Sequence, residues 1–225
     1  ALVVLGILFV TLAVADHWYH FFVCIFALFP GIIAVVPIFQ DRPQGYIQRV
    51  ALGVFGFMLF GVCLGHLGYM ANDWHYRPAV LTVLLCTELN DVFAFCCGKT
   101  IGGPKLAPNT SPNKTISGSV GAAVLTTALA ATLSHFVWQD TAVDRPLALV
   151  TFGLIVAVVG QLGDLTLSSL KRDLGIKDMA AVLPGHGGLL DRFNSLLFVS
   201  PAVFHFVGYF LGWGTNLPTR ILSGP

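Results

Sequence analysis

The chain has 225 residues, of which 56% are hydrophobic and only 10% are charged, and its mean hydropathy is +0.80. It carries 12 Lys and Arg and 11 Asp and Glu, whereas a soluble domain of this length would carry about 56 charges. So few charges cannot cover a water-soluble surface, and the net charge of +1 indicates no polyanionic partner. The composition excludes a secreted disulfide scaffold, a nucleic-acid-binding protein and a disordered chain.

Seven apolar segments have the length or composition of membrane-spanning helices. In chain order they are residues 1–15, 20–39, 50–71, 78–97, 118–138, 146–170 and 193–213. The predicted fold class is therefore all-α, a polytopic transmembrane helical bundle with two polar loops, 98–117 and 171–192. Because Ala1 lies in an apolar run without an initiator Met or a charged leader, we expect the first segment to be truncated. We assign residues 1–75 to N-terminal transmembrane helices and residues 76–225 to a catalytic transmembrane region.

The positive charges predict the orientation of the bundle. The second, fourth and sixth loops hold nine Lys and Arg, whereas the other loops and the C-terminal tail hold three. The positive-inside rule then places the two long polar loops in the cytoplasm, the compartment that contains nucleotides. We expect a multi-pass protein, in the inner membrane of a bacterium, with its site facing the cytoplasm.

Three carboxylates, Glu88, Asp91 and Asp164, fall inside or at the cytoplasmic end of predicted spans, where a charge is costly and indicates a functional site. Asn90 lies beside Asp91, and Ser168 shares a helix face with Asp164. Such oxygen ligands suit Mg²⁺ or another hard cation better than zinc. The alternative is that these residues form hydrogen bonds or ion pairs between helices.

The sixth loop has the composition of a phosphate site, because glycines let backbone N–H groups approach an anion that Lys and Arg neutralise. A simple cytoplasmic stop signal would explain its cations but not the carboxylates between them. The candidate residues here are Lys171, Arg172, Lys177, Asp178, His186, Gly187, Gly188, Asp191 and Arg192.

The fourth loop adds Lys99, Lys105 and Lys114 among glycines, prolines and hydroxyl side chains. It is not a Walker A motif, because position 93, where the first glycine would stand, is Phe. A phosphate-binding loop and a merely solvated connection both remain open for this segment.

These residues together resemble the phosphatidate cytidylyltransferase (CDP-diacylglycerol synthase) family. The resemblance covers about residues 88–200. Its signature is carried by Ser168, Leu170, Lys171, Arg172, Lys177, Asp178, Leu183, Pro184, His186, Gly187, Gly188, Asp191 and Arg192, preceded by Asn90, Asp91, Gly98, Lys99 and residues 105–115.

The resemblance implies a metal-dependent nucleotidyltransferase in which phosphatidic acid attacks CTP, giving CDP-diacylglycerol and pyrophosphate. It implies Mg²⁺, with a second cation as an option, membrane lipids and a homodimer as partners, and no nucleic acid. Asp164, Ser168, Asp191 and Asp91 would be metal ligands, with Lys171 and Arg172 also in the catalytic set. Substrates would contact Asn90, Lys105, Lys114, Lys177, Asp178, His186, Gly187, Gly188 and Arg192.

Three positions depart from the family pattern. Asn194 stands where the family usually has Asp, Asn113 where it has Lys, and Ser117 where it has Glu. Other interpretations therefore stay open: a cytidylyltransferase or CTP-dependent kinase acting on another lipid phosphate, such as an isoprenoid one, an inactive scaffold, or a transporter.

Overall fold

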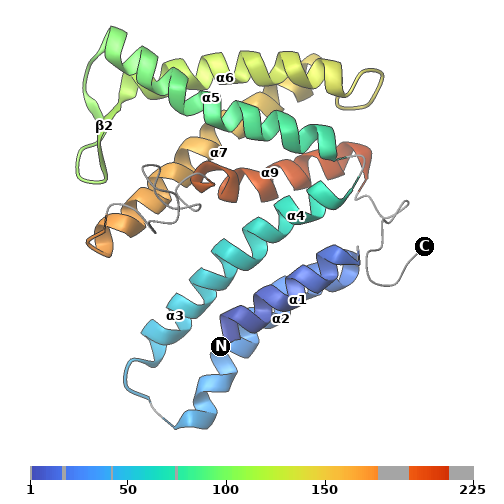
Figure 1. Ribbon diagram of the computed structural model, residues 1–225, viewed down its shortest axis with the longest axis vertical. Helices are drawn as coiled ribbons and strands as arrows, with labels where there is room; N and C mark the ends of the chain where they lie inside the picture. The colour runs from blue at the N-terminus through green and yellow to red at the C-terminus, as the bar shows by residue number, and fades with distance from the viewer. Residues whose placement is uncertain (1, 17–18, 42, 74–75, 177–192, 213–225) are drawn as a thin grey trace, which may run out of the picture. The chain divides into compact units, whose positions relative to one another are not determined.

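The computed structural model describes residues 2–16, 19–41, 43–73, 76–176 and 193–212. These residues are mostly helical, with one short hairpin (Figure 1). The elements are α1 (Leu2–Ala15), α2 (Tyr19–Val35), η1 (Val36–Gln40), α3 (Tyr46–Gly56), η2 (Phe57–Cys63), α4 (Leu64–Asn72), α5 (Arg77–Ile101), β1 (Lys105–Ala107), β2 (Ser111–Thr115), α6 (Ile116–Val137), α7 (Pro146–Asp173) and α9 (Asn194–Leu211).

Six described helical segments are long and apolar enough to cross a membrane. They are Tyr19–Phe39, Tyr46–Asn72, Arg77–Ile101, Ile116–Val137, Pro146–Asp173 and Asn194–Leu211. Helix α1 is equally apolar but has only 14 residues. The expected polytopic helical bundle is confirmed, and the chain is a multi-pass membrane protein.

The chain divides into two units, Ala1–Arg77 with Gly212–Pro225, and Pro78–Leu211. In the first unit, α3, the π-helical turn η2 and α4 follow one another without a break. Its core is aromatic: the rings of Phe29 and Phe57 lie 5.0 Å apart, and both side chains are buried. Gly6 leaves room for them, since a Cβ there would lie 2.4 Å from the Phe29 ring. The assignment of catalysis to residues 76–225 stays a prediction.

In the second unit, small residues bring the helices close together, as is usual for helix packing in membranes. A Cβ on Gly118 of α6 would lie 2.5 Å from the Ala94 carbonyl oxygen of α5. Gly153 of α7 makes a similar approach to Thr127 of α6. These close approaches bring α6 against α5 and against α7. The hairpin lies at the start of α6 (Figure 1).

The segment predicted as the loop 98–117 contains regular secondary structure. Helix α5 continues to Ile101 and ends where Gly102 and Gly103 take positive φ angles of 69° and 109°, a conformation that favours glycine. The chain then forms the antiparallel hairpin β1–β2, in which Lys105 pairs with Thr115. Thr115 also caps α6, because its side chain accepts a hydrogen bond of 3.1 Å from the Gly118 amide.

Candidate active site

A pocket of about 280 Å³ lies in the second unit, where the hairpin meets the helices. Helices α5, α6 and α7 and strand β2 all contribute side chains to its wall. The lining residues are Asp91, Ala94, Phe95, Ser111, Asn113, Lys114, Thr115, Ser119, Gln161 and Asp164. The pocket therefore gathers polar groups from four elements that are far apart in the sequence.

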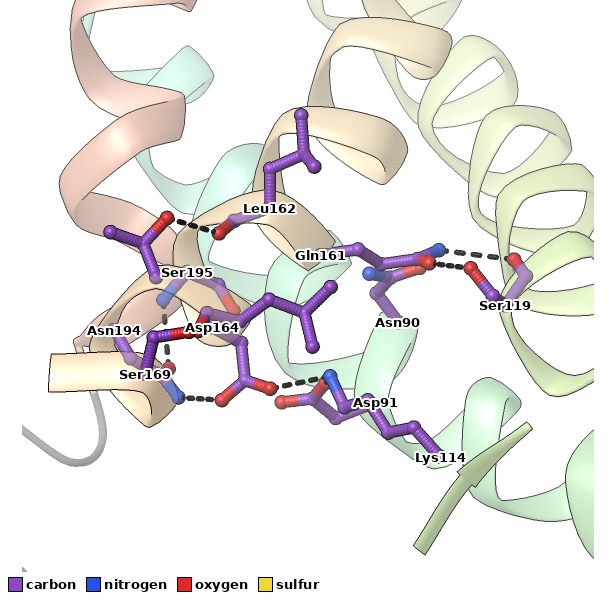
Figure 2. Close-up of polar contacts among 12 residues, drawn as sticks. Asn90, Asp91, Lys114, Ser119, Gln161, Leu162, Asp164, Ser169, Asn194 and Ser195 are labelled. Atoms are coloured by element: carbon purple, nitrogen blue, oxygen red, sulfur yellow. Dashed lines mark hydrogen bonds and ion pairs between the residues drawn. The ribbon is translucent and has the colours of Figure 1, made fainter. Parts of the chain in front are cut away.

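The centre of this site is Lys114, which lies between two carboxylates (Figure 2). Its Nζ is 2.5 Å from Oδ2 of Asp164 and 3.7 Å from Oδ1 of Asp91. The Lys114 and Asp164 side chains are 20% and 14% exposed, while Asp91 is 47% exposed. Because Lys114 directly precedes Thr115, the cap of α6, the position of its backbone is set by that helix start.

Asn194, the first residue of α9, holds Asp164 from the other side. The Asn194 side-chain nitrogen donates a hydrogen bond to Oδ1 of Asp164, and its oxygen accepts one of 2.7 Å from the Ser195 amide. The approach is close because Gly163 has no side chain: a Cβ there would lie 2.9 Å from the Asn194 carbonyl oxygen. Both carboxylate oxygens of Asp164 are thus engaged, one by an amide and one by an ammonium (Figure 2).

Two buried amides join the helices behind the carboxylates. Gln161 of α7 accepts a hydrogen bond from the Ser119 hydroxyl and donates one of 3.1 Å to the Ser119 carbonyl (Figure 2). Asn90 of α5 accepts one of 2.9 Å from Thr126 and donates one of 3.3 Å to the Ala157 carbonyl. These bonds satisfy polar groups that would otherwise be costly inside the bundle. They also fix the helix turns that carry Asp91 and Asp164.

Among the predicted site residues, the structure brings Asp91, Asp164 and Lys114 together. Asn90 is next to them but only 1% exposed and bonded to other helices. Lys105 is exposed on β1.

The predicted catalytic cations of α7 lie outside the pocket lining. Lys171 and Arg172 are in the last turn of α7. The Arg172 Nε donates to the Thr110 carbonyl of the hairpin at 3.4 Å. Ser168 is half-buried one turn after Asp164 and is not among the lining residues either.

A large part of the predicted site lies outside the described residues. These positions are Lys177, Asp178, His186, Gly187, Gly188, Asp191 and Arg192. Their proposed roles stay predictions.

The lining residues that the sequence did not predict as site residues are Ala94, Phe95, Ser111, Asn113, Thr115, Ser119 and Gln161. A signal for Ser119 was available, because Gln161 is a polar side chain within an apolar helix and needs a hydrogen-bonding partner. Ser111 lies within the segment 105–115 that carries the family resemblance, but no role was assigned to it, and Phe95 has no such signal in the sequence.

The described part of the site contains the kind of oxygen donor that a hard cation prefers, although only two carboxylates. The position between Asp91 and Asp164 already holds a positive charge, the Lys114 ammonium, and the donors around it are carboxylate oxygens, which Mg²⁺ prefers. In the part of the chain that the structure describes, no group of three or more His, Cys, Asp or Glu could hold a metal ion. The described part thus offers two carboxylates to such an ion.

Comparisons of the sequence with a family model and with curated proteins point to the same family. The sequence model described as the cytidylyltransferase family matches residues 1–210. A protein of Escherichia coli (strain K12) named uncharacterized protein YnbB is 32% identical over 183 residues, which are 79% of this chain and 60% of that protein.

Two relatives carry the name phosphatidate cytidylyltransferase. The protein of Staphylococcus haemolyticus (strain JCSC1435) is 38% identical over 155 residues, 65% of this chain and 58% of that protein. The protein of Bacillus subtilis (strain 168) is 36% identical over 167 residues, 74% of this chain and 59% of that protein. The chain spans about three-fifths of the length of these curated relatives.

Proposed function

The chain belongs to the cytidylyltransferase family, and we propose that it is a membrane-embedded CTP:phosphatidate cytidylyltransferase. The observation that carries the proposal is the Asp91–Lys114–Asp164 cluster in a pocket beside the hairpin, within the C-terminal halves of the membrane-spanning helices α5 and α7. With a divalent cation held by its carboxylates, such a pocket could receive both a water-soluble nucleotide and a lipid phosphate. The names of the relatives from Staphylococcus haemolyticus and Bacillus subtilis support the same activity.

The proposed reaction is a displacement at phosphorus. A phosphate oxygen of phosphatidic acid forms a bond to the α-phosphorus of CTP, the bond to the bridging oxygen breaks, and pyrophosphate leaves. No general base is required, because a phosphomonoester is already ionised at neutral pH. The protein has to position two anions and offset their charge.

The roles of the residues follow from their chemistry. Asp164 and Asp91 would hold Mg²⁺, with Asp191 and Ser168 as further ligands; Mg²⁺ would neutralise phosphate oxygens. The buried bonds of Gln161 and Asn90 keep the two carboxylates in place. Phosphate binding is assigned to cations and glycines, namely Lys105, Lys114, Lys171, Arg172, Lys177, His186, Gly187, Gly188 and Arg192.

Formation of CDP-lipid tests the proposal. Purified protein with radiolabelled CTP, phosphatidic acid and Mg²⁺ should release pyrophosphate and yield CDP-diacylglycerol. Asp164→Ala should abolish the product, whereas Glu88→Gln should retain it, because Glu88 is exposed on α5 and is not among the residues that line the pocket. Absence of product with every lipid phosphate tried, or full activity of Asp164→Ala, would overturn the proposal.

Product identification separates the alternatives. Mass spectrometry would distinguish CDP-diacylglycerol from the CDP derivative of an isoprenoid phosphate and from a phosphorylated lipid made by a CTP-dependent kinase. Substrate flux into liposomes without nucleotide turnover would instead favour a transporter. We also propose that the protein is a homodimer in a bacterial inner membrane with this pocket on the cytoplasmic side.

A further inference from the structure

Lys114 occupies the position between the two carboxylates that, under the proposed function, hold a divalent cation. We propose that Lys114 is a built-in counter-ion that the divalent cation displaces, and that the freed ammonium then binds a substrate phosphate. The inference rests on the proposed function but concerns a different event, the exchange of one cation for another before the reaction.

The contacts of Lys114 support an exchange rather than a permanent ion pair. The Nζ atom is buried, and no neutral hydrogen-bond acceptor among the described residues contacts it. The ammonium is therefore held by the carboxylates of Asp164 and Asp91 alone within that part of the chain. A group held only by charge is released when a stronger charge takes its place.

The two members of the Lys114–Asp164 ion pair differ in what fixes their side chains. Asp164 is anchored through its other oxygen by Asn194, so it stays in place when the lysine leaves. Lys114 is carried by β2 of a short hairpin, on a flexible four-carbon side chain. The carboxylate is the fixed component of the pair, and the ammonium is the movable one.

The formal charge of the pocket shows how the exchange would favour the binding of an anionic substrate. Asp91, Asp164 and Lys114 are the charged side chains among its described lining residues, and together they carry a formal charge of −1. A pocket with that charge repels a nucleoside triphosphate. Adding a divalent cation brings the formal charge of the same groups to +1 and frees an ammonium for a phosphate oxygen. Cation binding thus converts the pocket from repelling anions to attracting them.

The first test measures Mn²⁺ binding to the nucleotide-free protein in detergent by titration calorimetry. Lys114→Met removes the competing ammonium, so the Mn²⁺ dissociation constant should fall by about tenfold or more. A tenfold fall corresponds to about 1.4 kcal/mol of binding free energy. Lys114→Arg keeps the charge and should bind Mn²⁺ no more tightly than the unmodified protein. Unchanged or weaker Mn²⁺ binding by Lys114→Met would overturn the inference.

The second test needs no variant and so does not depend on whether Lys114→Met folds. A water-soluble acylating reagent is applied to the unmodified protein with and without Mg²⁺, and modification is quantified by mass spectrometry. Acylation of Lys114 should rise several-fold with Mg²⁺, whereas Lys99, which is exposed at the end of α5, should show no change. Equal acylation of Lys114 under both conditions would contradict displacement.

Neither measurement uses turnover, so the two proposals can fail separately. A protein that forms CDP-lipid but shows neither effect retains its proposed function and refutes the exchange. A protein that shows both effects but forms no CDP-lipid retains the exchange and refutes the proposed reaction.

Discussion

The side-chain nitrogen of Asn194 donates a hydrogen bond to Oδ1 of Asp164, joining the start of α9 to α7 across 30 residues of sequence. The Asn194 side chain is oriented with its nitrogen toward Asp164 because its side-chain oxygen accepts a hydrogen bond from the Ser195 backbone N–H. Asn194 therefore serves Asp164 as a donor, where the family pattern would place another carboxylate. Its neutral side chain avoids a repulsion that an Asp at this position would create.

Replacing Asn194 should affect stability in a cation-dependent way. Asn194→Asp would set two carboxylates against each other, and we expect the free energy of unfolding in EDTA to fall by about 1–3 kcal/mol. Mg²⁺ should restore most of this loss by binding between them. Thermal unfolding in detergent with EDTA or Mg²⁺ measures both effects, with Asn194→Ala as the control that loses the bond without adding charge. Equal stability of Asn194→Asp and the unmodified protein in EDTA would contradict this view of the contact.

Gly153 should be intolerant of a side chain. A Cβ at this position would lie 2.6 Å from the Thr127 carbonyl oxygen and 2.9 Å from its Cα, and backbone atoms cannot rotate away. Gly153→Ala should therefore force α6 and α7 apart and cost about 1–3 kcal/mol of unfolding free energy.

Gly160, on the same helix, is the matched control. Its nearest contacts to a new Cβ would be ordinary ones of 3.5 and 3.7 Å. Gly160→Ala should therefore leave the thermal midpoint unchanged or slightly raised, because Ala favours a helix over Gly. Similar midpoints for the two variants would show that the α6–α7 approach is looser than described.

Asn90 and Thr126 should be energetically coupled. Their hydrogen bond of 2.9 Å is buried, so either substitution leaves the other polar group without its partner. A double-mutant cycle of Asn90→Ala and Thr126→Val should give a coupling energy of about 0.5–3 kcal/mol. If the cycle shows no coupling while Asn90→Ala raises the KM for CTP, Asn90 acts as a substrate ligand instead.

The membrane orientation can be checked from the two ends of α6. The hairpin lies at the start of this helix and the α6–α7 turn at its end (Figure 1). With the hairpin in the cytoplasm, a membrane-impermeant maleimide added to intact cells should label Thr141→Cys but not Ser111→Cys. Labelling after lysis should reveal Ser111→Cys, and the unmodified protein provides the background from its five native cysteines. The reverse pattern would invert the predicted topology.

Much of the architecture could be predicted because hydropathy is a local property. The predicted span 118–138 and the observed α6, Ile116–Val137, differ by one or two residues at each end. The C-terminal end of α5 was less well predicted: the predicted span ends at residue 97, whereas the helix continues to Ile101. Glycine is common just after the end of a helix, so Gly98 indicates a helix end there. The structure instead uses Gly98 for packing: its missing side chain leaves room for Thr115, whose Oγ1 would lie 2.7 Å from a Cβ there.

The sequence alone determined that this is a membrane protein and where most of its helices run, and it predicted Asp91 and Asp164 as site residues because a carboxylate within a span is costly, since each conclusion depends on residues within one or two turns. Only the tertiary structure decided what those acids contact. Lys114, predicted to bind a phosphate, lies against Asp164, and Asn194, known only as a departure from a pattern, donates to the same carboxylate. These pairings join residues of different elements, and they depend on how closely glycines such as Gly163 let the helices approach. That distance is a property of the packed bundle and not of any single segment.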